Sequence, residues 1–258
     1  MNILFIHGAW MTPLCWEKFA GFFDSKGVRW QAPAWPYKDA PIETLRAHPD
    51  PNLAGLGITE IVDHYDRIIR GLPEPPVLIG HSFGGLFTQM LLDRGLGAAG
   101  IAIDSAPPKG VNPFRPTVFR ANLRILATPG GWHKIIQPSF ADFQYGFANN
   151  MPQPEQRAAF DRYVVPESGR PFFQSAFAMF NNITRVNFAN NRRAPLLLIA
   201  GSVDHLCPAA MIRDNYAKYR QSTVRTDFKE FENRAHWIIG QPGWEEVADY
   251  CLEWIQRL

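Results

Sequence analysis

Four short apolar runs, widely separated along the chain, constrain the fold most strongly. Each has four or five residues, and none alternates apolar with polar side chains as a half-exposed strand would. Runs of this kind are typical of parallel strands that are buried on both faces. The sequence therefore predicts an open, mostly parallel sheet. The runs are Ile3–Ile6, Pro76–Ile79, Gly100–Ile103 and Leu196–Ala200.

Stretches with helical spacing of apolar residues lie between these runs. After Glu60, for example, apolar side chains recur at Ile61, Tyr65 and Ile68. Strands that alternate with helices predict an α/β fold, and right-handed crossovers place the helices on both faces of the sheet. The helical stretches are Leu14–Lys26, Glu60–Arg70, Phe83–Arg94 and Trp244–Leu258.

Two segments interrupt the alternation. The proline-rich segment Pro33–Gly57 is predicted to be a long surface loop. Residues 107–190 hold 11 of the 19 phenylalanines but no strand-like apolar run, and we expect a helical cap over a pocket. Residues 1–106 and 191–258 then form the core domain, although the same phenylalanines could simply pack core helices. Helices are expected near Arg115–Leu126, Pro154–Tyr163 and Pro171–Asn182.

Composition narrows the class of protein. The 26 Lys and Arg against 24 Asp and Glu give a net charge of +2, which argues against a nucleic-acid binder. No apolar stretch reaches the length of about 18 residues that a membrane helix needs, and no signal peptide is evident. We expect a cytoplasmic protein without cofactor or metal, and the sequence leaves open a homodimer. The cysteines Cys15, Cys207 and Cys251 form no metal-binding or disulfide pattern.

The strongest chemical signal is the sequence Gly80-His81-Ser82-Phe83-Gly84, which fits G-x-S-x-G. A buried-strand run precedes it and a helical run follows it. In such a turn the serine lies at a strained junction between strand and helix, where its hydroxyl points out of the sheet. We therefore predict that Ser82 is a nucleophile.

A serine hydroxyl needs a base, and His236 is the best placed of the seven histidines. It follows the strand-like segment Val224–Phe231 and precedes the last helix, which places it at the carboxyl edge of the sheet, where ligands bind. His7 and His81 flank the candidate site, and we expect them to support it through hydrogen bonds.

Two aspartates compete to orient the base. Asp204 and Asp104 each follow a predicted strand directly. We prefer Asp204, because it lies in a glycine-containing turn and is followed by a short path to the last strand. The chain order is then Ser82, Asp204, His236. Asp104 can equally be a turn-forming residue before Ser105.

The turn after the first strand completes the site. The backbone N–H groups of Ala9 and Phe83 are predicted to face the negative charge that develops on an attacked carbonyl oxygen. Trp10, His81 and Trp237 lie beside these positions, and we predict that they line the substrate pocket. The tryptophans favour an apolar acyl or aryl group.

Four motifs together resemble the α/β-hydrolase superfamily, in particular its lidded serine esterases and lipase-like relatives. They are FIHGAW, LIGHSFGG, LLLIAGSVDHLCP and ENRAHW, and the resemblance extends over nearly the whole chain. It implies an open, mostly parallel sheet with a lid inserted after the family's sixth strand. It also implies Ser82 as nucleophile, His236 as base, Asp204 as its orienter, and Ala9 and Phe83 as oxyanion donors. The family's initial antiparallel hairpin is missing.

We expect from these residues a cofactor-free serine hydrolase that acts on small-molecule carboxylic esters. A lactonase, an amidase, a perhydrolase or a hydroxynitrile lyase would use the same triad. A lysine in the pocket would favour the lyase, and the sequence offers Lys109 and Lys134. An aspartate nucleophile is opposed by Ser82 itself. A non-catalytic receptor with the hydrolase fold is the alternative from another class.

Overall fold

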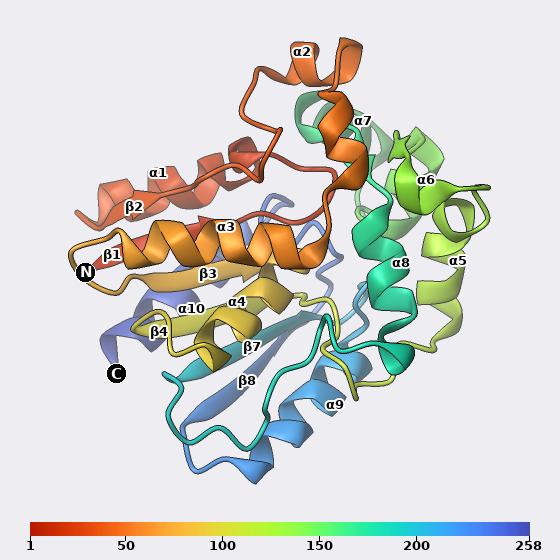
Figure 1. Ribbon diagram of the computed structural model, residues 1–258. Coiled ribbons are helices and arrows are strands. Elements are labelled where there is room, and N and C mark those ends of the chain that lie inside the picture. The colour runs from red at the N-terminus through yellow and green to blue at the C-terminus, as the bar shows by residue number, and fades with distance from the viewer.

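A six-stranded parallel sheet organises the chain. The computed structural model describes residues 1–258, and the strand order is β2-β1-β3-β4-β7-β8 (Figure 1). All five strand pairs of this sheet are parallel, so the predicted α/β fold is confirmed. The strands are β1 Asn2–Ile6, β2 Arg29–Gln31, β3 Val77–His81, β4 Ala99–Ile103, β7 Leu196–Gly201 and β8 Thr226–Phe231.

Burial explains why the apolar runs became strands. Every residue of β3, β4 and β7 is buried, and the register places apolar side chains side by side, as with Ile79, Ile101 and Leu197. The edge strand β2 has the sequence Arg29-Trp30-Gln31 and was not predicted, because it is short, largely exposed and has no apolar run.

Helices cover both faces of the sheet (Figure 1). Helices α1 and α10 pack against each other, as do α3 and α4. The four helical stretches expected in the core are all present, whereas α9 was not anticipated. None of the helices is both long and apolar enough to cross a membrane. The helices are α1 Glu17–Ser25, α3 Ile58–Arg70, α4 Phe83–Asp93, α9 Ala209–Lys218 and α10 Trp244–Gln256.

The segment between β4 and β7 lies beyond the carboxyl ends of the strands (Figure 1). It contains the three expected helices, but the last of them ends at Ala176 and is followed by a 3₁₀ turn. A fourth helix and a small antiparallel sheet of β5 and β6 were not predicted. The elements are α5 Pro116–Leu126, β5 Ile135–Ile136, α6 Phe140–Gly146, α7 Gln153–Tyr163, β6 Glu167–Ser168 and α8 Arg170–Ala176.

The prediction of a long surface loop over Pro33–Gly57 is wrong in one respect. The segment includes helix α2 Ile42–Ala47 and a 3₁₀ turn over Pro51–Gly55, and the side chains of Trp35 and Lys38 are fully buried. Its prolines do break regular structure, but Trp35 between them packs in the core against His7 and Phe87.

Candidate active site

Ser82 is the single residue between β3 and α4. Its φ of 59° and ψ of −120° are strained for a residue other than glycine. Backbone hydrogen bonds hold it there: the N–H of Ser82 donates to the carbonyl of Ile103 at 2.9 Å, and its carbonyl accepts from the N–H of Ala106 at 3.0 Å. The serine is therefore fixed by the end of the neighbouring strand β4 as well as by its own turn.

The close approach of β1 explains Gly84 in the elbow. A Cβ atom added at this residue would lie 2.0 Å from the carbonyl oxygen of Ile6. Only glycine allows the start of α4 to pass this close to the end of β1. The same approach brings the turn after β1 next to Ser82.

His236 and Asp204 form a buried hydrogen-bonded pair. His236 Nδ1 lies 2.7 Å from Asp204 Oδ2, and both side chains are at most 1% exposed. The other carboxylate oxygen of Asp204 accepts the backbone N–H groups of Leu206 at 2.6 Å and Cys207 at 2.9 Å. The carboxylate is thereby fixed in place, and because it occupies Nδ1 of His236, Nε2 is left as the ring nitrogen with no partner in the protein.

Asp104 has a different environment. Its Oδ1 accepts the backbone N–H of Gly201 at 2.7 Å and so ties the end of β4 to the end of β7. Burial, together with the nearby Asp204 carboxylate, raises the pKa of Asp104 well above its usual range. Of the two candidate acids, Asp204 is the one that is hydrogen-bonded to His236.

His7 and His81 make the kind of contacts that we expected of them. His81 Nε2 donates to the backbone carbonyl of His236 at 2.7 Å. His7 Nε2 accepts the backbone N–H of Trp35 at 3.2 Å, so its Nδ1 carries the proton and donates to the carbonyl of Gly8 at 2.9 Å. Burial lowers the pKa of both histidines well below the usual range, and both rings are therefore neutral supports.

Two backbone N–H groups beside Ser82 are unused. Ala9 follows β1, and Phe83 is the first residue of α4, where an N–H has no partner within the helix. Neither N–H donates a hydrogen bond to another group of the protein. Both residues line the same cavity as Ser82. An oxygen atom bearing negative charge would find two free donors there.

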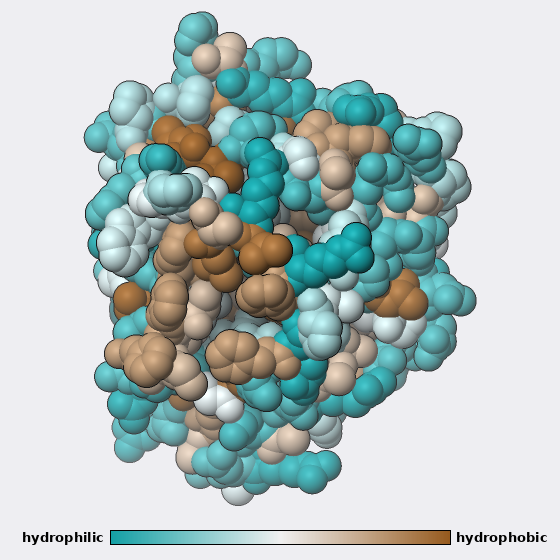
Figure 2. Space-filling model, turned by 90° about the vertical axis from the view of Figure 1, so that its right-hand side faces the viewer, coloured by the Kyte–Doolittle hydropathy of each residue, from teal (hydrophilic) through white to brown (hydrophobic).

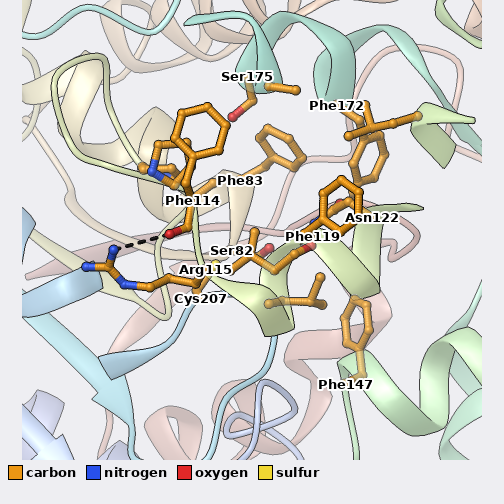
Figure 3. A pocket seen from close by; sticks show the side chains of 18 of the residues that line it. Ser82, Phe83, Phe114, Arg115, Phe119, Asn122, Phe147, Phe172, Ser175 and Cys207 are labelled. Atoms are coloured by element: carbon orange, nitrogen blue, oxygen red, sulfur yellow. Dashed lines mark hydrogen bonds between the residues drawn. The ribbon is translucent and has the colours of Figure 1, made fainter. Parts of the chain in front are cut away.

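An apolar cavity of about 430 Å³ opens above Ser82 (Figure 3). Of its 20 lining residues 13 are hydrophobic, and most of its walls come from the β4–β7 segment. The outer surface of this segment is also rich in apolar side chains (Figure 2). The exposed ones are Phe114, Phe119, Leu123, Trp132, Phe177, Met179 and Phe180.

Only one of the three side chains that were predicted to line the pocket does so. Trp10 lines the cavity and stacks on Phe172 of α8 with a centroid distance of 4.8 Å. His81 and Trp237 do not line it: both are fully buried, and Trp237 packs against Tyr163. The prediction rested on neighbourhood in the sequence, but the side chain of His81 is hydrogen-bonded to the backbone of His236 and that of Trp237 packs on α7.

Phenylalanines of the β4–β7 segment and Cys207 complete the cavity, and the sequence did not single them out. Phe147 contacts the ring of His236 edge-on at a centroid distance of 4.9 Å. Cys207 lines the cavity, and burial raises the pKa of its thiol. The abundance of phenylalanine in residues 107–190 was the available signal, but it could not indicate which rings face inward.

Two groups of buried side chains have the residue types of metal ligands. His81, Asp104 and His236 form one, and Asp204, Cys207 and His236 form the other, each with ligand atoms within 4.8 Å of one another. The hydrogen bond between His236 and Asp204 already uses atoms from both groups. Cysteine binds metals as the thiolate, which the raised pKa of Cys207 disfavours.

Comparisons with known proteins bear on the family and the fold. A sequence model of the alpha/beta hydrolase family matches residues 3–250. A monoacylglycerol lipase of Paleococcus ferrophilus is similar in structure, with a TM-score of 0.69, 20% identity and coverage of 98% of this chain and 93% of that one. No curated protein matches the sequence.

Two further solved structures share the fold. The methylesterase MES16 from Arabidopsis has a TM-score of 0.71 at 13% identity and covers 100% of both chains. A pyrethroid hydrolase from Sphingobium faniae JZ-2 has a TM-score of 0.64 at 17% identity, covering 98% of this chain and 96% of that one.

Replacing Gly84 by alanine tests the close approach at the elbow. Because the new Cβ would meet a backbone carbonyl, we expect Gly84→Ala to lower the free energy of unfolding by roughly 3 kcal/mol or more. Gly21→Ala is the control: Gly21 lies in α1 with nothing near its Cβ position, and alanine should stabilise the helix by about 0.5–1 kcal/mol. Urea unfolding followed by circular dichroism measures both. Equal stabilities of the two variants would contradict this account of the elbow.

Proposed function

The chain belongs to the alpha/beta hydrolase family, and on that premise we propose that it is a serine hydrolase that cleaves carboxylic esters through an acyl-enzyme. Ser82 is the nucleophile, His236 the general base and Asp204 the residue that orients the base. The N–H groups of Ala9 and Phe83 form the oxyanion hole.

The observation that carries the proposal is the pair of unused N–H groups at the cavity floor. A buried backbone N–H without a partner is rare, and it normally indicates that a ligand or water completes it. Here two such donors flank a strained serine. Attack by a serine on a carbonyl produces a negatively charged oxygen, which two converging donors stabilise.

The proposed reaction uses the atoms of the site that have no hydrogen-bond partner in the protein, which are His236 Nε2 and the N–H groups of Ala9 and Phe83. His236 Nε2 removes the proton from Ser82 Oγ while Oγ forms a bond to the acyl carbon, and the carbonyl oxygen takes up the negative charge. The ester C–O bond then breaks, and the imidazolium gives its proton to the departing alcohol. Water attacks the acyl-enzyme in the same way and releases the acid. Asp204 fixes the ring of His236 through Nδ1 throughout the reaction.

The cavity supports an apolar substrate. Its walls are mainly hydrophobic, and a small uncharged ester would lose little hydration on entering it. Several structural neighbours are named as a lipase, a methylesterase or a pyrethroid hydrolase, and these names agree with an ester. We assign residues 107–190 the role of a cap over the core domain of residues 1–106 and 191–258, since they supply most of the cavity wall.

The lysines that would favour a lyase do not support that reaction. Neither Lys109 nor Lys134 lines the cavity above Ser82. Lys109 Nζ donates instead to the carbonyl of Asn181 at 2.7 Å. Ester cleavage needs no cation at this place, because the backbone N–H groups supply the positive potential.

Labelling with a fluorophosphonate tests the proposal. We expect wild type to take up one label per chain and to hydrolyse p-nitrophenyl butyrate, and both properties to be lost in Ser82→Ala and in His236→Ala. Intact-protein mass spectrometry measures the label. Ser175→Ala is the matched control, because Ser175 lines the same cavity on α8 but lacks the elbow, and it should keep both properties. A wild-type chain that takes up no label would refute an activated Ser82, and a label without ester turnover would refute ester hydrolysis.

Replacing each of the two aspartates by asparagine tests which of them orients His236. We expect Asp204→Asn to lower kcat about ten-thousand-fold, because an amide at this place stabilises the wrong tautomer of His236. Asp104→Asn should lower kcat by less than about tenfold, because an amide oxygen can still accept the N–H of Gly201 and costs at most one weakened hydrogen bond. Steady-state kinetics at neutral pH measure both values. Similar losses in the two variants would contradict the assignment of the acid.

A further inference from the structure

A buried ion pair lies behind the turn that carries Ala9. Lys38 Nζ and Glu167 Oε2 are in direct contact, and both side chains are 0% exposed. Lys38 comes from the turn after β2, and Glu167 is in β6 of the β4–β7 segment. The reaction described above makes no use of either charge.

Glu167 holds the backbone of Trp10. The oxygen that contacts Lys38 also accepts the N–H of Trp10 at 3.3 Å, while the second oxygen accepts the N–H of Ser168 at 2.9 Å. The carbonyl of Trp10 accepts the N–H of Val165 at 2.9 Å. Both backbone groups of Trp10 are therefore bound by residues just before or in β6. Trp10 needs such support, because its φ of 62° is strained.

The peptide on the other side of Ala9 is also fixed. His7 Nδ1 donates to the carbonyl of Gly8, and a peptide unit is planar, so this bond also sets the direction of the Ala9 N–H. His7 is held by the N–H of Trp35. Lys38 belongs to the same turn as Trp35, since its own N–H donates to the Trp35 carbonyl at 3.1 Å.

The energetics of the pair point to a role other than stability. Burial lowers the pKa of Lys38, and the Glu167 carboxylate only partly offsets this effect. Replacing a buried ion pair by apolar residues of similar volume is often neutral or stabilising for a protein. What apolar residues cannot replace here is the carboxylate oxygen that accepts the N–H of Trp10.

We propose that Lys38 and Glu167 are positioning residues that fix Trp10 and thereby aim the Ala9 N–H at the oxyanion. Lys38 holds Glu167 in place through the ion pair, and Glu167 transmits this constraint from the β4–β7 segment to the turn after β1. The proposal rests on the proposed serine-hydrolase function.

The decisive variant is Lys38→Met/Glu167→Met, which removes both charges and keeps the side-chain volumes similar. We expect it to fold, with a melting temperature lowered only by the loss of the acceptor for the backbone N–H groups of Trp10 and Ser168. Its kcat for p-nitrophenyl butyrate should fall about 10- to 100-fold with little change in KM, since a small misplacement of a catalytic donor costs up to this much. Its affinity for a trifluoromethyl ketone, which forms a tetrahedral oxyanion on the serine, should fall by a similar factor.

Glu17→Met/Arg162→Met is the matched control. This ion pair also joins the β4–β7 segment to the core, between α7 and α1, but it touches no residue of the Ala9 turn. It should keep the wild-type kcat and the wild-type affinity for the ketone. A loss of kcat shared equally by both double variants would overturn the proposal.

Three other outcomes would also overturn the positioning proposal or the proposed function. Wild-type kcat and ketone affinity in Lys38→Met/Glu167→Met would show that the pair does not position the donor. Failure of this variant to fold would overturn the proposal too, because the pair would then be needed for the fold. If wild type itself neither hydrolyses esters nor binds the ketone, the proposed function fails instead, and the wild-type measurement separates the two results.

Discussion

The backbone of Ser82 depends on the parallel pairing of β3 with β4. A residue other than glycine at a φ of 59° stores strain, and the hydrogen bonds from Ser82 to Ile103 and Ala106 at the end of β4 offset it. These bonds exist only because the two strands run side by side to the same edge of the sheet. The fully buried strands therefore do more than stabilise the core, since their register determines where the serine hydroxyl lies.

The turns after three other strands lie at the same edge of the sheet as Ser82 for the same reason. β1, β7 and β8 are parallel to β3 and end at the same edge, so the turns that follow them converge. These turns carry Ala9, Asp204 and His236. The proposed chemistry uses the strained turn at Ser82, the free N–H groups and the pair of His236 and Asp204. The first two are backbone features, so their placement depends on the path of the chain more than on the identity of side chains.

The sequence was most informative where a local pattern has one physical solution. Short apolar runs predict buried strands, and G-x-S-x-G between a strand and a helix predicts the elbow. The strand β2 was not predicted, because three residues at an exposed edge of the sheet need no apolar run. The buried position of Lys38 could not be predicted, because it depends on Glu167, which is 129 residues away along the chain. His81 and Trp237 were placed in the pocket from their neighbours, but sequence proximity does not fix the direction of a side chain.

A crystal structure of the fluorophosphonate adduct would show whether Ser82 and the two backbone N–H groups act together, because the adduct imitates the tetrahedral intermediate. We expect phosphorus bonded to Ser82 Oγ, with the phosphoryl oxygen at about 2.7–3.1 Å from both the Ala9 and Phe83 nitrogens. The cavity enclosed by the β4–β7 segment should hold the alkyl group. A phosphoryl oxygen that points away from these two nitrogens, or an adduct on another residue, would contradict the account.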